Sequence, residues 1–222
     1  MHFFFCNKRF IFLLKADLRF VTIFFLLSSV KLELLWRILH NMGKIIMAKK
    51  KIILSIMVSV DGYVCAINGS ISLLQQYYQE FIPAGTELIY PSDCGAVLLG
   101  RKTYEQYPKE VESLLKRGQK LIVASRQNME ALSGVIRIKG DLPLALKKVQ
   151  AQLKCNIWIA GGPSIINQLT SVNSVDEIRL TTVPVQLGGG KPLFDTDLKA
   201  PNVSLTEVQQ YGGLTHSVWQ KK

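Results

Sequence analysis

The sequence predicts an α/β protein whose mainly parallel sheet is covered by helices on both faces and ends in an antiparallel strand pair. From Lys51 onward, short apolar, β-branched runs alternate with segments in which apolar residues recur every three or four positions. Apolar runs without polar alternation are typical of strands buried on both faces. Such strands alternating with helices indicate a parallel sheet, and a turn at Gly212-Gly213 indicates a final hairpin.

The length of 222 residues favours one domain with an appendage. The net charge is +11, of which residues 1–46 carry 7 − 2 = +5 and the remaining residues +6. This moderate, dispersed charge suits an anionic small ligand. The sequence has no basic stripe with interleaved aromatic residues, so we expect no nucleic-acid partner.

The four cysteines, Cys6, Cys65, Cys94 and Cys155, form no Cys-x-x-Cys pair and have no histidine at ligand spacing. We therefore expect no metal site. Isolated cysteines are typical of reduced thiols in a cytoplasmic protein, which is the location that we expect.

Residues 1–46 differ from the rest of the chain. They are rich in Phe, Leu and Ile, and their longest uncharged run, residues 20–30, is shorter than the roughly 20 residues that span a bilayer. Met47 is followed by Ala-Lys-Lys-Lys and a clear strand, as at a natural protein start. We interpret residues 1–46 as an extension outside the fold and residues 47–222 as the folded domain. The apolar core of a signal peptide and a membrane anchor are the alternatives.

In the first half of the domain, apolar and β-branched residues predict a strand over Lys51–Val60, which Asp61-Gly62 ends. A turn at Asn68-Gly69-Ser70 leads to a helix over Ser72–Ile82, with Ser72 as its N-cap. The other elements expected here are a loop over Pro83–Cys94, a strand over Gly95–Leu99 and a helical segment from Arg101 that is interrupted near Pro108.

In the second half, Asp141 is the expected N-cap of an amphipathic helix over Asp141–Leu153, with Pro143 in its first turn. Apolar runs predict the strands, and a Gly-rich loop is expected over Leu187–Phe194. The strands are expected over Lys120–Ala124, Val135–Ile138, Asn156–Ala160, Asp176–Val183, Val203–Gln209 and Leu214–Trp219.

The most informative stretch runs from Asn156 to Ile166, where an apolar strand ends at Gly161-Gly162 and a helix begins at once with Pro163. Glycine lets the backbone approach a ligand without a Cβ atom in the way. The unpaired N–H groups of a new helix then favour an anion, most often a phosphate. The alternative is a tight strand–helix connection that binds nothing.

Two further strand ends carry groups that suit phosphate. Gly100-Arg101-Lys102-Thr103-Tyr104-Glu105 enters a helix, and Ala124-Ser125-Arg126 follows the next strand. Ligands of open α/β sheets bind beyond the carboxyl ends of the strands, so Ser125 and Arg126 are candidates for holding the 2′-phosphate that separates NADP from NAD. Each cation taken alone is as well explained by solvation at a helix start. Three strand ends that suit an anion in one sheet favour a nucleotide site. Separately, the loop over residues 183–194 either connects strands or shapes a substrate pocket.

In order along the chain, five motifs resemble the dihydrofolate reductase-like superfamily. The motifs are Ser59-x-Asp61-Gly62, Gly100-Arg101-Lys102-Thr103-Tyr104-Glu105, Ser125-Arg126, Gly161-Gly162-Pro163 and Pro184-x-x-Leu187-Gly188-Gly189-Gly190. The closer resemblance is to the reductase domain of bacterial riboflavin biosynthesis, the C-terminal domain of a bifunctional deaminase–reductase, and to its stand-alone relatives. It covers about residues 49–222 and implies a three-layer α/β/α dihydrofolate reductase-like fold, NADPH as cofactor and hydride transfer.

The resemblance also implies which residues form the site. Near the cofactor phosphates it places Gly100, Arg101, Lys102 and Thr103, and near the 2′-phosphate Ser125 and Arg126. Beneath the pyrophosphate it places Gly161, Gly162, Pro163, Ser164 and Ile165. The candidates for a catalytic proton donor are Asp61, Tyr77 and Glu80.

The chain departs from both classical enzymes at the substrate side. Dihydrofolate reductases carry an acid on the helix after the first strand, where this sequence has Tyr77. The riboflavin enzymes usually carry an acid just before the glycine turn, where this sequence has Ala160. Their substrate bears a ribose phosphate, yet residues 70–82 contain no Lys or Arg to receive it.

The resemblance therefore implies an NADPH-dependent oxidoreductase that acts on a small pyrimidine or pterin-like heterocycle, similar to the 5-amino-6-(5-phosphoribosylamino)uracil reductase of riboflavin biosynthesis. Pterin reduction of the dihydrofolate reductase type and a nucleotide-binding module without turnover are the alternatives. Relatives of the riboflavin enzyme commonly pair through their sheets, so we expect a homodimer.

Overall fold

The computed structural model describes residue 33 and residues 50–130, 132–195 and 202–222. Residues Lys50–Lys222 form a compact unit of their own. The expected extension over residues 1–46 lies outside the described residues, apart from residue 33, and stays a prediction. In the part of the chain that is described, no helix is long and apolar enough to cross a membrane, and no group of acidic, histidine and cysteine side chains is suited to hold a metal ion.

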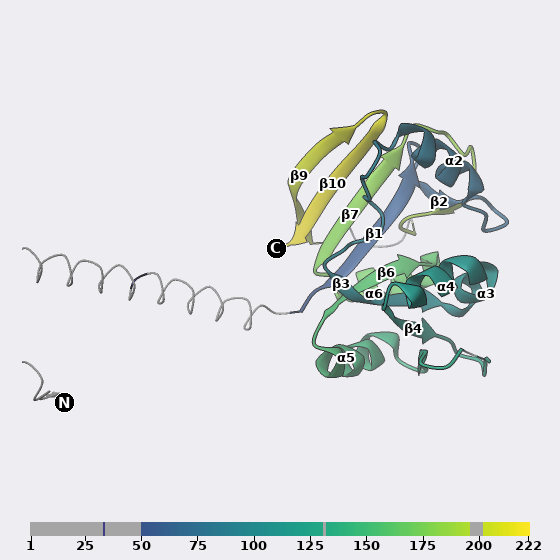
Figure 1. Cartoon of the computed structure of the whole chain (residues 1–222), viewed down its shortest axis with the longest axis vertical. Coiled ribbons are helices and arrows are strands. Elements are labelled where there is room, and N and C mark those ends of the chain that lie inside the picture. The colour runs from purple at the N-terminus through teal and green to yellow at the C-terminus, as the bar shows by residue number, and fades with distance from the viewer. Residues whose placement is uncertain (1–32, 34–49, 131, 196–201) are drawn as a thin grey trace, which may run out of the picture. The chain divides into compact units, whose positions relative to one another are not determined.

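An eight-stranded sheet organises the unit, in the order β5-β4-β3-β6-β1-β7-β10-β9 (Figure 1). The strands from β5 to β7 run parallel, and β10 pairs antiparallel with both β7 and β9. This arrangement confirms the mainly parallel sheet with an antiparallel C-terminal pair. The strands are β1 Ile52–Ser59, β3 Cys94–Gly100, β4 Lys120–Ala124, β5 Ile136–Ile138, β6 Asn156–Gly161, β7 Glu177–Val183, β9 Val203–Tyr211 and β10 Leu214–Lys221.

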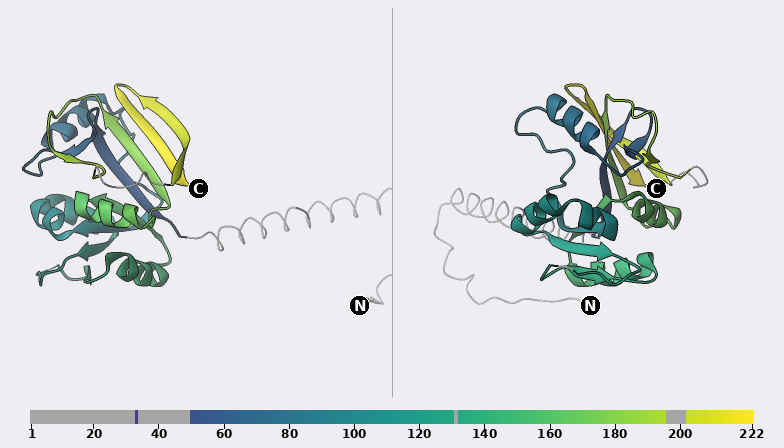
Figure 2. Two further views of the ribbon diagram at one scale, coloured as in Figure 1. Left: turned by 180° about the vertical axis from the view of Figure 1, so that it is seen from behind. Right: turned by 90° about the vertical axis from the view of Figure 1, so that its right-hand side faces the viewer.

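Helices cover both faces of this sheet. They are α2 Ser72–Phe81, α3 Arg101–Gln106, α4 Pro108–Lys116, α5 Leu142–Leu153 and α6 Pro163–Ser171. On one face, α3 and α4 pack against Val97 and Trp158, while α5 and α6 pack against Leu98 and Ile159 on the other. Figure 2 shows α3 and α4 on the opposite side of the sheet from α6. Successive residues of a strand point to opposite faces, which is why neighbouring residues of β3 serve different layers.

Local chemistry fixes several element ends where the sequence placed them. The side chain of Asp141 accepts a hydrogen bond from the Leu144 N–H at 2.8 Å and so caps α5. Pro108 begins α4, so the expected interruption separates it from α3. The expected capping by Ser72 is wrong, because Ile71 occupies the cap position and no side chain caps α2. The Ser72 hydroxyl instead forms a hydrogen bond with that of Ser70, at 2.9 Å.

A second, two-stranded sheet was not expected. It pairs β2, Tyr63–Cys65, antiparallel with β8, Lys191–Pro192. The pairing brings Gly190, directly before β8, close to the backbone of β2. A Cβ atom on Gly190 would stand 2.2 Å from the carbonyl oxygen of Cys65. Strands of two and three residues are too short to show a period of two in the sequence.

Candidate active-site cleft

A cleft with a volume of about 920 Å³ lies at the carboxyl ends of β3, β4 and β6. Clefts that hold small molecules and cofactors commonly reach this size. All of the residues expected to bind a nucleotide line it, and they come from the three separate motifs. They are Gly100, Arg101, Lys102, Thr103, Ser125, Arg126, Gly161, Gly162, Pro163, Ser164 and Ile165. The structure therefore brings the three predicted strand ends together around one space.

The Gly161-Gly162 turn joins β6 to α6 through a cis peptide bond. Gly161 has φ +129°, and a Cβ atom built on it would meet no other atom within 4 Å. Its backbone is therefore open to the cleft, as the close approach of a ligand requires. No side chain caps the start of α6 in the described chain, so no side chain occupies the N–H groups that an anion would use.

The glycine turn also packs tightly against the motif that follows β3. A Cβ atom on Gly162 would stand 3.1 Å from the Thr103 hydroxyl, and one on Gly100 would stand 3.2 Å from the side chain of Ile165. The absence of side chains at these two glycines lets α3 and the start of α6 approach each other. This packing fixes the relative positions of two of the three motifs.

Cations gather at one half of the cleft, beyond β3, β4 and β5. Arg101 and Lys102 follow β3, Arg126 follows β4, and Lys139 follows β5. Because α3 has only six residues, its macrodipole adds little, and these side-chain charges carry the attraction for an anion. Arg101 is held by Glu105 through two hydrogen bonds of 2.9 and 3.0 Å.

Ser125 shapes the turn after β4. Its hydroxyl donates to the Gln127 carbonyl at 2.8 Å and accepts from the Gln127 N–H at 3.2 Å. Arg126 is the middle residue of this turn, where it is exposed and forms no ion pair within the described chain. An exposed guanidinium without a partner remains able to bind a phosphate.

Aromatic side chains form the other half, nearer β6 and α2. The indole N–H of Trp158 donates to the Ser55 carbonyl at 2.8 Å, and the Tyr90 ring lies edge-on to Trp158 with centroids 5.4 Å apart. The Tyr78 hydroxyl accepts from the Leu88 N–H at 3.1 Å. Burial raises the pKa of both Tyr78 and Tyr90, so both phenols stay protonated at neutral pH.

The three candidates for a proton donor do not line the cleft. The carboxylate of Asp61 accepts from the Ser59 hydroxyl at 2.5 Å and from the N–H groups of Leu187 and Gly188 at 3.1 and 2.8 Å. The hydrogen bond from Ser59 holds the pKa of Asp61 below its ordinary value of 3.8, with a smaller opposing effect of desolvation. Asp61 therefore anchors the Gly-rich loop to the first turn.

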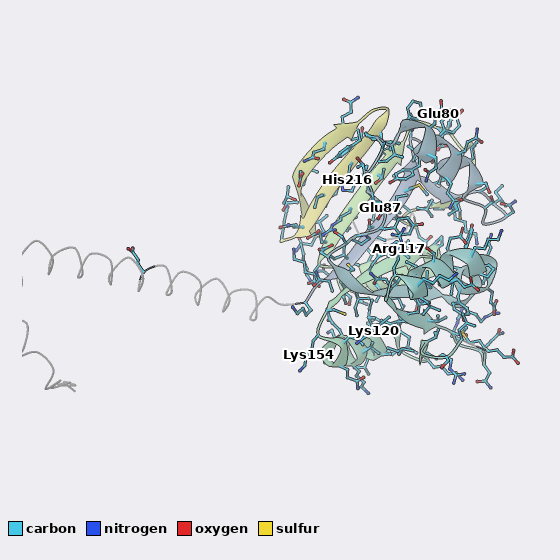
Figure 3. The ribbon with its side chains drawn as sticks, viewed as in Figure 1. Glu80, Glu87, Arg117, Lys120, Lys154 and His216 are labelled. Atoms are coloured by element: carbon cyan, nitrogen blue, oxygen red, sulfur yellow. The ribbon has the colours of Figure 1, made fainter. Side chains whose placement is uncertain are left out.

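The other two candidates, Tyr77 and Glu80, lie on α2 outside the cleft. Tyr77 stacks on Phe81, with centroids 6.4 Å apart and planes 25° apart, beside the core beneath α2. Glu80 is exposed at the outer end of α2 (Figure 3). The residues of α2 that line the cleft are instead Gln75, Tyr78 and Gln79.

Several residues of the cleft were missed by the sequence reasoning. They are Tyr90, Glu110, Lys139, Trp158 and Lys191. Glu110 lies inside α4, and Lys191 belongs to β8, which only the long-range pairing with β2 brings to the cleft. The one sequence signal was the position of Lys139, directly after a predicted strand, as for Arg101 and Arg126.

A mainly parallel sheet that is covered on both faces and ends in an antiparallel C-terminal pair, together with the similarity to solved structures, shows an α/β protein of the dihydrofolate reductase-like fold. The profile of the RibD C-terminal domain family matches residues 50–217, and the chain belongs to that family. The resemblance found in the motifs is thereby confirmed. Reductase activity is associated with this family, and its members act on small molecules.

Individual proteins are similar to this chain in sequence or in fold. The chain is 28% identical over 166 residues to the uncharacterized protein YwjB of Bacillus subtilis, covering 74% of this chain and 94% of that protein. It is 26% identical over 131 residues to the dihydrofolate reductase of Mycoplasma genitalium, covering 57% and 75% of the two chains. A solved structure described as a putative riboflavin biosynthesis protein from Shewanella sp. PV-4 is similar with a TM-score of 0.59 and 21% identity, covering 78% and 99%. That last similarity shows the fold alone.

Proposed function

We propose that the chain is an NADPH-dependent reductase that transfers hydride to a small planar heterocycle, of the kind that 5-amino-6-(5-phosphoribosylamino)uracil represents. The observation that supports this proposal is the division of a single cleft. One half carries the predicted phosphate-binding residues, and the other is lined by aromatic rings. A dinucleotide and a flat ring need this combination side by side.

The cationic half fits the phosphates of NADPH. Arg101, Lys102, Arg126 and Lys139 line this half, and the cleft as a whole is lined by five cations, with Lys191 as the fifth, and one acid, Glu110. The excess of positive charge matches an anionic cofactor. The open backbone of Gly161 and the uncapped start of α6 receive the pyrophosphate, while Arg126 is best placed for the 2′-phosphate because no carboxylate within the described chain holds it.

The aromatic half fits the ring to be reduced. NADPH supplies the hydride, and the chain's own contribution is to hold the ring in contact with Trp158 and Tyr90 and to keep water away. Lys191 supplies a cation that the helix after the first strand lacks, and it suits a phosphate on the substrate. This arrangement supports the riboflavin-type substrate over a pterin.

A nucleotide-binding module without turnover is the second candidate. It is favoured by one observation, namely that Asp61, Tyr77 and Glu80 lie away from the cleft. The two functions differ in whether bound NADPH is consumed.

The test is a calorimetric titration of the full chain with NADPH, followed by measurement of NADPH absorbance with reducible pyrimidines and pterins. We expect NADPH to bind and at least one pyrimidine to be reduced. Binding without consumption by any compound of the set would favour the module, and absence of NADPH binding would refute both.

A further inference from the structure

Glu110 is the one acidic residue that lines the cleft within the described chain. It lies on α4, on the same side as Val111 and Leu114, which are buried against the sheet and also line the cleft. Its neighbour Glu112 is turned outward and pairs with Lys116 at 3.5 Å. The helix therefore presents one carboxylate to the ligand space and another to solvent.

Within the described chain, the carboxylate of Glu110 has neither a hydrogen bond nor an ion pair, although its residue is half-buried. The nearby cation Arg117 is already committed, since it pairs with Glu87 at 3.3 Å and lies over the Tyr90 ring, 5.2 Å from its centroid. An ionised carboxylate accepts hydrogen bonds only. Neither oxygen of Glu110 is fully buried, so water reaches the carboxylate, and a ligand carrying N–H groups binds it by replacing that water with charge-assisted hydrogen bonds.

The surroundings of Glu110 belong to the aromatic half. Glu110 lines the same cleft as Tyr90 and Tyr107, and its charge adds to the burial that raises the pKa of both phenols. The Tyr107 hydroxyl is taken, since it donates to the Gly69 carbonyl at 3.1 Å. The indole N–H of Trp158 is also taken, by Ser55. These two donors are therefore engaged elsewhere, and the carboxylate remains available to a ligand.

We propose that Glu110 determines substrate specificity by accepting hydrogen bonds from an amino-substituted edge of the heterocycle. This inference rests on the proposed function, since it names the substrate class of the same cleft. A ring with adjacent N–H donors satisfies both carboxylate oxygens while it contacts the aromatic rings of Trp158 and Tyr90. A ring that carries only acceptors at that edge leaves the carboxylate unpaired and is rejected.

The test uses two small probes with the same ring. One is 4,5-diaminopyrimidine, whose adjacent amino groups offer N–H donors to both carboxylate oxygens, and the other is 4,5-dimethoxypyrimidine, which offers acceptors only. Calorimetry on the full chain, with and without saturating NADPH, measures both for the wild type, Glu110→Gln and Glu112→Gln. The last variant is the matched control, because it removes a charge from the same helix on its outer side.

We expect the wild type to prefer the diamino probe by at least about tenfold, as one charge-assisted hydrogen bond implies. Glu110→Gln should lose about that factor for the diamino probe and leave the dimethoxy probe unchanged, whereas Glu112→Gln should behave as the wild type. Equal affinity of the wild type for the two probes, or no binding of either, would overturn the proposal, as would an unchanged preference in Glu110→Gln. NADPH affinity in the same samples reports the proposed function separately and shows that each variant is folded.

Discussion

Removing Arg126 should narrow the preference of the chain for NADPH over NADH. The guanidinium is exposed, lines the cleft beyond β4 and has no ion-pair partner within the described residues. A charge-assisted hydrogen bond contributes roughly 1.5–3 kcal/mol, and exposure places this one at the low end. Because about 1.4 kcal/mol corresponds to one decade in affinity, Arg126→Ala should weaken NADPH binding about tenfold. NADH lacks the 2′-phosphate, so its affinity should barely change.

Arg101→Ala should have a smaller effect on the same ratio. Glu105 already holds the Arg101 guanidinium through two hydrogen bonds, so less of its hydrogen-bonding capacity is open to the cofactor. Arg137→Ala is the control, because Arg137 lies on β5 and is exposed but does not line the cleft. All three variants remove one positive charge, so a difference among them reports position rather than net charge.

The assay is a fluorescence or calorimetric titration of each variant with both nucleotides, repeated at two salt concentrations. Higher salt should weaken NADPH binding more than NADH binding, since exposed charges are screened. Equal affinity of the wild type for the two nucleotides would refute the assignment of these strand ends to the 2′-phosphate. The same conclusion would follow if Arg126→Ala weakened both nucleotides to the same extent.

Three further predictions concern the frame of the site. Gly161→Val forces a side chain onto a backbone with φ +129° and into the cleft, so it should weaken the binding of NADPH and of NADH by the same factor. A titration in which only one of the two nucleotides binds more weakly would contradict this. Trp158→Phe removes the hydrogen bond to the buried Ser55 carbonyl and should lower the free energy of unfolding by about 1–3 kcal/mol. Unfolding in urea measures this, and an unchanged transition midpoint would show that the hydrogen bond contributes nothing to stability. Hydrogen bonds from Arg179 hold the pKa of Asp93 below 3.8, so the stability they add is present above that pH and is lost as pH falls through the lowered pKa. The melting temperature of Asp93→Asn should accordingly lie below that of the wild type at pH 6 and approach it below about pH 4, and a gap that stays constant with pH would exclude this linkage.

Strands β1, β3 and β6 of the main sheet were predictable because burial on both faces demands apolar runs. Ile53, Leu98 and Ile159 are all fully buried, and each lies in such a run. Helix α5 was predictable because its cap, Asp141, acts on residues next to it in the sequence. The convergence of the three motifs that we predicted to bind a nucleotide followed from the parallel arrangement, which brings the carboxyl ends of neighbouring strands to one edge.

The substrate side was not predictable, because it depends on contacts between distant segments. Asp61 looked like a turn residue with a catalytic alternative, but besides nearby Ser59 its partners are backbone N–H groups more than a hundred residues away, at Leu187 and Gly188. Glu110 was indistinguishable in sequence from Glu112 until the helix was placed on the sheet. Lys191 reaches the cleft only through the β2–β8 pair.

The β2–β8 pair has a consequence for exchanging parts between relatives. Asp61 binds the backbone at Leu187 and Gly188, Gly190 rests against the Cys65 carbonyl, and β2 pairs with β8. Residues 59–70 and 184–194 therefore behave as a single graft, although more than a hundred positions separate them in the sequence. A chimera that replaces only one of the two segments will bring an unmatched backbone surface to the other, while a chimera that transplants both together carries this wall of the cleft intact.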